Sequence, residues 1–187
     1  DDPTLGALRV LVDAGSGFGE SNAHLEAGRE GVAQHLGQPF AWRDLTHILI
    51  THGHGDHFGD TLHLACTLGA EVFCIHEIAV YLREHGAARV TGLNKGGTVI
   101  GPGGVRATMV DARHSGGLDT DGRVLPGGEP AGWVLAFPGG PTIYHAGDTM
   151  IFGDMALIGE LWSPEIAFLP IGGHYTMDPP QAARAAR

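Results

Sequence analysis

The amino-acid sequence predicts a layered α/β domain, in which helices pack against β-sheets. A short apolar run at residues 46–50 precedes a segment with helical spacing at residues 59–70. A second strand-like run, residues 71–75, precedes an amphipathic pattern over residues 76–86. The length of 187 residues suits a single domain spanning residues 1–187. The 31 glycines favour many turns over a helix bundle.

The first half of the chain is predicted to alternate strands with helices. Residues 8–15 (LRVLVDAG) predict a strand that ends in a glycine turn, and residues 46–50 (THILI) predict a buried strand. The histidine-rich loop that follows is expected to turn into a helix near Phe58. Gly69 and Gly86 supply the stop signals of the two helices.

The second half is predicted to contain more strands. Strands are expected at residues 96–100 and 105–112, at 131–137 and 142–147 as a hairpin, and at 165–171 as a further buried strand, with a helix at 153–162. Residues 113–130 carry Gly, Asp and Pro but little apolar content. They are long for a structureless loop, so we expect a lid over the functional site.

The last segment, MDPPQAARAAR (177–187), has a helix start but no helix stop. Asp178 is a predicted N-cap, and Pro179 occupies the first helical position. No glycine or proline closes this helix before Arg187. We therefore expect the natural polypeptide to continue, and the short stretch before the first strand suggests that the domain is truncated at both ends.

Composition narrows the range of partners. The formal net charge of −10 argues against a nucleic-acid partner and against stable membrane association, both of which favour clustered Lys and Arg. Cys66 and Cys74 lie in apolar segments, which predicts buried free thiols and a cytoplasmic protein. A small-molecule substrate remains the expected partner, and a homo-oligomer is possible.

The stretch THGHGDH (51–57) follows the predicted strand directly and predicts a metal site. Alternate residues of an extended segment point the same way, so His52 and His54 can bind one ion together. Asp56 and His57 follow where the loop turns, and they can face a second ion. Imidazole and carboxylate ligands suit zinc, and also iron or manganese.

Two more residues of ligand type lie at predicted strand ends. His114 follows the strand at 105–112, and Asp148 follows the strand at 142–147. Either residue alone would be read as a solvated or structural side chain. A carboxylate at the position of Asp148 is well placed to bridge two metals.

The order of these motifs resembles the metallo-β-lactamase superfamily. The resemblance is closest to a branch of small metal-dependent hydrolases related to the L-ascorbate phosphate lactonases. It rests on four runs, which lie within Thr46 to Pro180: THGHGDHFGDTLHLACTLGAEV (51–72), GLNKGGTV (92–99), GEPAGWVL (128–135) and TIYHAGDTMIFGDMALIGELWSPEIAFLPIGGHYTMDP (142–179). It implies an αββα sandwich, with two face-to-face β-sheets between outer helices.

The resemblance also implies a role for each residue of the site. His52, His54 and His114 would hold the first metal ion. Asp56 and His57 would hold the second ion, and Asp148 would bridge both. Asp13, in LVDAGSG, would support the histidine loop by hydrogen bonds without binding metal.

The sequence departs from the family pattern at both ends. Family members usually begin with a further strand that carries a Gly-His pair, and they have another histidine ligand beyond the position of Arg187. The second metal site is therefore expected to be one ligand short in this chain. His174, on a loop flanked by glycines, can approach the metals or the substrate, or can make a structural hydrogen bond.

The expected function is a metal-dependent hydrolase. Two divalent ions, zinc foremost, would share a hydroxide that attacks an ester, lactone or phosphodiester bond of a small molecule. Asp56, Asp148 and His174 are the predicted catalytic residues. A di-iron redox protein and a non-catalytic metal-binding protein of the same fold are the alternatives.

Overall fold

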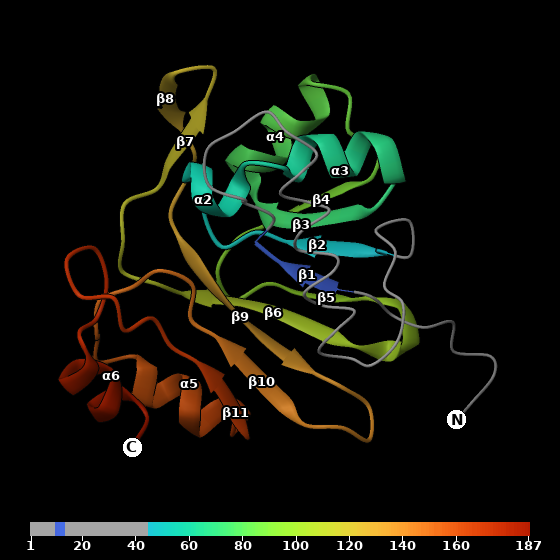
Figure 1. The fold of residues 1–187 in the computed structure, drawn as a ribbon. Helices are drawn as coiled ribbons and strands as arrows, with labels where there is room; N and C mark the ends of the chain where they lie inside the picture. Colours follow the sequence, from blue (N-terminus) through green and yellow to red (C-terminus); the bar gives the residue numbers. More distant parts are fainter. Residues whose placement is uncertain (1–9, 14–44) are drawn as a thin grey trace, which may run out of the picture.

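The fold of residues 10–13 and 45–187 is described by a computed structural model. Two β-sheets lie face to face, and helices cover their outer sides (Figure 1). This arrangement confirms the predicted αββα sandwich. Predictions for residues 8, 9, 14 and 15, at the ends of the first expected strand, lie outside the described residues.

The first sheet has four strands in the order β1-β2-β3-β4, and every neighbouring pair is parallel. Its strands are β1 (Val10–Val12), β2 (His47–Leu49), β3 (Glu71–Ile75) and β4 (Val90–Leu93). Parallel sheets are normally covered on both faces, and Ile48 and Val72 are accordingly completely buried. Helices α3 (Thr61–Leu68) and α4 (His76–Glu84) lie on the outer side (Figure 1). Gly69 ends α3 in the left-handed conformation, with φ of 66°, as a helix-stopping glycine should.

The second sheet has five strands in the order β11-β10-β9-β6-β5. Its strands are β5 (Thr98–Ile100), β6 (Arg106–Asp111), β9 (Ala131–Ala136), β10 (Thr142–His145) and β11 (Ile166–Phe168), and a short 3-10 turn, η2 (Pro102–Gly104), separates β5 from β6. Side chains alternate along β9 because successive residues of a strand face opposite sides. Trp133 belongs to the core between the sheets, whereas Val134 packs with Ile158 of α5 (Met155–Trp162) in the core outside them.

The chain between Arg113 and Pro130, for which a lid over the functional site is predicted, has secondary structure of its own. It contains a two-stranded hairpin, β7 (Gly117–Thr120) and β8 (Arg123–Pro126), beside the first sheet (Figure 1). Leu118 is 1% exposed and anchors the hairpin in the main hydrophobic core. The two strands of the hairpin are hydrogen-bonded to each other, so a segment with little apolar content still forms regular secondary structure.

Other boundaries and burial assignments also differ from the sequence predictions. A short helix, α2 (Gly55–Phe58), begins before the expected position near Phe58. Strand β11 is exposed along its length because it is the edge of its sheet, and Cys66 is exposed whereas Cys74 is buried. The predictions that β11 and Cys66 are buried were therefore wrong.

The C-terminal helix, α6 (Pro179–Ala185), begins as predicted. The Asp178 side chain accepts a hydrogen bond from the backbone amide of Gln181 at 2.8 Å, which satisfies one of the amides that a helix start leaves free. No helix in the described ranges, 10–13 and 45–187, is long and apolar enough to cross a lipid bilayer.

Candidate metal centre

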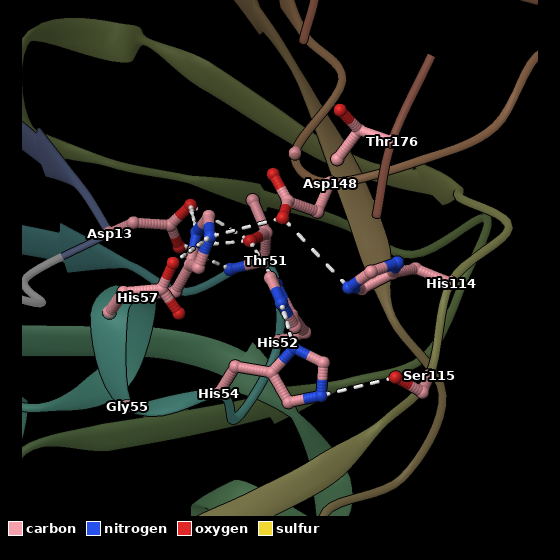
Figure 2. A network of polar contacts seen from close by, with 12 residues as sticks. Asp13, Thr51, His52, His54, Gly55, His57, His114, Ser115, Asp148 and Thr176 are labelled. Carbon is pink, nitrogen blue, oxygen red and sulfur yellow. Dashed lines mark hydrogen bonds and ion pairs between the residues drawn. The ribbon is translucent and has the colours of Figure 1, made fainter. Parts of the chain in front are cut away.

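Most of the predicted ligands, and Asp13, which is predicted to support them, lie where four strands end. Asp13 follows β1, the loop 51–54 follows β2, His114 follows β6 and Asp148 follows β10. Their side chains converge in space although they come from both sheets (Figure 2). The sandwich therefore brings together residues that lie up to 135 positions apart, from 13 to 148.

Three imidazoles form the first group of candidate ligands. One ring nitrogen each of His52, His54 and His114 lies within 4.8 Å of the others. His52 Nε2 and His54 Nδ1 are 2.9 Å apart, and the His114 ring centre is 5.1 Å and 5.0 Å from those of His52 and His54. This is the set that the family resemblance assigns to the first metal.

A second group shares one histidine with the first. Nitrogens of His52 and His57 and an oxygen of Asp148 also lie within 4.8 Å of one another. Asp148 Oδ2 is 3.5 Å from His57 Nε2 and 3.8 Å from His114 Nε2. The Asp148 carboxylate thus lies close to a histidine of each group.

Asp13 supports both the histidine loop and the second group. Its carboxylate accepts hydrogen bonds from the Thr51 amide at 2.8 Å, from the Thr51 hydroxyl at 2.8 Å, and from His57 Nδ1 at 2.9 Å. Its backbone is left-handed, with φ of 57°, a conformation that Asp tolerates better than most residues. The predicted hydrogen-bonding role of Asp13 is confirmed.

These bonds also fix the proton positions of two imidazoles. The Thr51 hydroxyl gives its proton to Asp13, so its oxygen accepts from His52 Nδ1 at 3.0 Å. His57 Nδ1 likewise donates to Asp13. In both rings Nε2 is then directed into the cluster, as a metal ligand must be.

The charges of the cluster follow from burial and from the two carboxylates. Burial, reinforced by the neighbouring imidazoles, lowers the pKa of His52 to about 2, and burial also lowers the pKa of His114. Burial acts in the same direction on His57, but hydrogen bonds to Asp13 and Asp148 outweigh it and raise the pKa of His57 to about 10. The bond from His57 in turn lowers the pKa of Asp148.

The donor set fits a divalent ion. Neutral imidazoles keep a free lone pair, and an ionised carboxylate supplies an oxygen, which together suit zinc, iron or manganese. An ion at the second group would take the place of the His57 Nε2 proton, as metals do when they bind.

Two predicted residues lie outside these two groups. The Asp56 side chain is 59% exposed, with Oδ2 at 3.5 Å from His57 Nε2. His174 is exposed, and its ring packs edge-on against Tyr175 at 4.5 Å. Among the described residues neither joins the assembled ligand groups, so their roles as ligand and catalytic residue stay predictions.

Two residues that were given no role in the site from the sequence also contact the cluster loops. The Ser115 hydroxyl lies 3.2 Å from His54 Nε2. Asp119 of β7 accepts a hydrogen bond from the Gly55 amide at 3.0 Å and donates from its own amide to the Gly53 carbonyl at 2.8 Å. These partners lie more than 60 positions apart, so no local spacing could have revealed them.

Comparisons with known proteins identify the family of the chain. The model of the β-lactamase superfamily domain matches residues 8–187. A UPF0173 metal-dependent hydrolase from Koribacter versatilis is 52% identical over 139 residues, which cover 74% of this chain and 59% of the relative. Another from Methylobacterium nodulans is 42% identical over 183 residues, which cover 98% of this chain and 73% of the relative.

The solved structure of Igni18, a metallo hydrolase from Ignicoccus hospitalis, superposes with a TM-score of 0.64 at 42% identity. The match covers 75% of this chain and 58% of that protein. The chain spans about three fifths of the length of the first relatives that it matches. With the domain model matching nearly its whole length, the chain belongs to the β-lactamase superfamily, among the UPF0173 metal-dependent hydrolases.

Proposed function

We propose that the protein is a metal-dependent hydrolase that cleaves an ester, lactone or phosphodiester bond of a small molecule. One observation carries this proposal: the group of His52, His54 and His114 lies beside His57 and Asp148, with Asp148 Oδ2 3.5 Å from His57 Nε2 and 3.8 Å from His114 Nε2. Such a pair of adjacent groups fits two metal ions that act on one substrate.

In this proposal His52, His54 and His114 hold the first ion, and His57 and Asp56 hold the second, with Asp148 bridging. Zinc is the foremost candidate, and manganese or iron are alternatives. Bound divalent ions lower the pKa of water to roughly 7 and polarise the bond under attack. Asp13 keeps His57 oriented throughout, since it holds Nδ1 at 2.9 Å.

The proposed substrate is small and is not a nucleic acid. The net charge of −10 disfavours a polyanion, and the resemblance to lactonase relatives favours a lactone or another ester. His174 is proposed to contact the substrate. Its loop is tied to the site, because the Met177 amide donates to the Thr149 carbonyl at 3.0 Å, one residue beyond Asp148.

The test combines metal analysis with activity. The purified protein is loaded with zinc, manganese or iron and assayed on lactone, ester and phosphodiester panels. His54→Ala and Asp148→Ala should abolish metal-dependent turnover, whereas His63→Ala, on the exposed side of α3, should not. Unchanged turnover in both site variants would refute the proposal.

The same experiment separates the alternatives. Bound iron with a visible absorbance band and no hydrolysis would indicate a redox centre. Stoichiometric metal without turnover on any panel would indicate a binding protein.

A further inference from the structure

Thr149 joins two loops of the metal centre. It follows Asp148 directly and is completely buried. Its hydroxyl accepts a hydrogen bond from the Arg113 amide at 2.9 Å and donates to the Met150 carbonyl at 2.7 Å. The Met150 amide returns a bond to the Arg113 carbonyl at 3.1 Å. The residue after Asp148 is thus bonded to the residue before His114.

The sheet by itself does not fix the distance between these two loops. Strands β6 and β10 are not neighbours, because β9 lies between them. Adjacent strands are about 4.8 Å apart, so the two strand ends are separated by roughly twice that distance. Yet His114 Nε2 and Asp148 Oδ2 approach to 3.8 Å. The backbones of the two loops also approach closely, since the Met150 amide is 3.1 Å from the Arg113 carbonyl oxygen.

Gly147 makes this close approach possible. Its φ is 63°, and a Cβ there would lie 2.9 Å from the carbonyl oxygen of Ala131, the first residue of β9. The turn at Gly147 thus passes directly over β9. It is not joined to β6 by the hydrogen bonds of paired strands. The hydrogen bonds through Thr149 and Met150 link the backbones of the two loops directly.

We propose that Thr149 is a positioning residue that sets the separation between His114 and Asp148. The inference rests on the proposed metal site. It adds that Thr149 holds His114, a proposed ligand of the first ion, close to Asp148, the proposed bridging carboxylate. The hydrogen bonds of the Thr149 hydroxyl go to backbone atoms, not to the His114 ring or the Asp148 carboxylate. It acts through the backbone of Arg113, one residue before His114.

The hydroxyl can be tested separately from the backbone bonds. Thr149→Val keeps the shape of the side chain but can neither accept from Arg113 nor donate to Met150. Thr149→Ser keeps the hydroxyl. Thr108→Val is a matched control, because Thr108 is 5% exposed, lies on β6 and bonds through its hydroxyl to Thr98 at 2.8 Å.

The measurement is zinc affinity by competition with a chromophoric chelator, together with the visible spectrum of the cobalt-loaded protein and the melting temperature of the metal-free protein. Loss of a group that orients metal ligands typically weakens metal binding 10- to 100-fold. We expect a loss of about that size and an altered cobalt spectrum in Thr149→Val. Thr149→Ser should be close to wild type, and Thr108→Val should melt earlier without losing affinity.

The outcomes separate this inference from the proposed function. No zinc binding by the wild-type protein would overturn the metal site itself. Wild-type affinity and an unchanged cobalt spectrum in Thr149→Val would overturn only the positioning role, as would equal losses in Thr149→Val and Thr108→Val. If the valine variant does not fold, Thr149→Ala removes the same hydroxyl without adding a methyl group, and the same criteria apply.

Discussion

Asp13 and His57 are joined by a hydrogen bond of 2.9 Å across 44 positions of sequence. This bond directs His57 Nε2 toward Asp148 and contributes to the raised pKa of His57, about 10. Asp13→Asn keeps an acceptor oxygen and tolerates the left-handed backbone, but it removes the negative charge. We expect zinc affinity to fall by about 10- to 100-fold, as for other groups that orient metal ligands.

The control for this prediction is Asp121→Asn. Asp121 also has a left-handed backbone, with φ of 49°, but it is exposed at the turn between β7 and β8. The same chemical change there should leave zinc affinity within error of wild type. Equal affinity for wild type and Asp13→Asn in chelator competition would contradict the role given to Asp13.

Gly53 is predicted to tolerate no side chain. A Cβ at this position would lie 2.7 Å from the Gly117 carbonyl oxygen and 2.8 Å from the Leu118 Cα, both of them backbone atoms. Gly53→Ala should therefore push β7 away from the histidine loop at a cost of about 1–3 kcal/mol. Thermal unfolding followed by circular dichroism should show a drop of about 2–4 °C per kcal/mol.

Gly55→Ala provides the comparison, because the nearest atoms to a Cβ there belong to the Asp119 side chain at 3.8 Å. That variant should melt close to wild type. If the two alanine variants melt at the same temperature, close packing between β7 and the histidine loop is not what requires Gly53.

Asp119 is predicted to stabilise the start of α2 through its bond to the Gly55 amide. Asp119→Ala removes the acceptor and should cost about 1 kcal/mol, the usual net value of one hydrogen bond. Asp119→Asn keeps an oxygen in place and should lose less. Urea denaturation measures both free energies of unfolding, and an equal loss in the two variants would show that the carboxylate charge, not the hydrogen bond, matters.

The candidate ligands could be picked out of the sequence because their signals are local. His52 and His54 alternate after a strand. The apolar pattern also marks the ends of two further strands, which are followed by His114 and Asp148. The layered fold followed from the same pattern, since strands and helices differ in period. Only the family resemblance, however, placed these residues in one site.

The rest of the site depends on contacts between distant segments. Asp119 reaches Gly55 and Ser115 reaches His54 through the packing of the β7–β8 hairpin, which its own composition did not predict. Asp56, whose side chain is 59% exposed, lies in the first turn of a helix that begins at Gly55, earlier than expected. A shift of a few residues in a helix start changes the direction of a side chain, because each residue turns the helix by about a quarter of a turn or more.

The two cysteines are predicted to differ in reactivity. Cys74 is completely buried, and burial raises the pKa of its thiol to about 12, whereas Cys66 is exposed on α3. Because the thiolate is the reactive form, an aromatic disulfide reagent at mildly alkaline pH should titrate one thiol rapidly in the native protein and the second only after denaturation. Cys66→Ser should abolish the rapid phase. Two thiols that react equally fast in the native protein would mean that the strand carrying Cys74, between β2 and β4, opens far more readily than its packing implies.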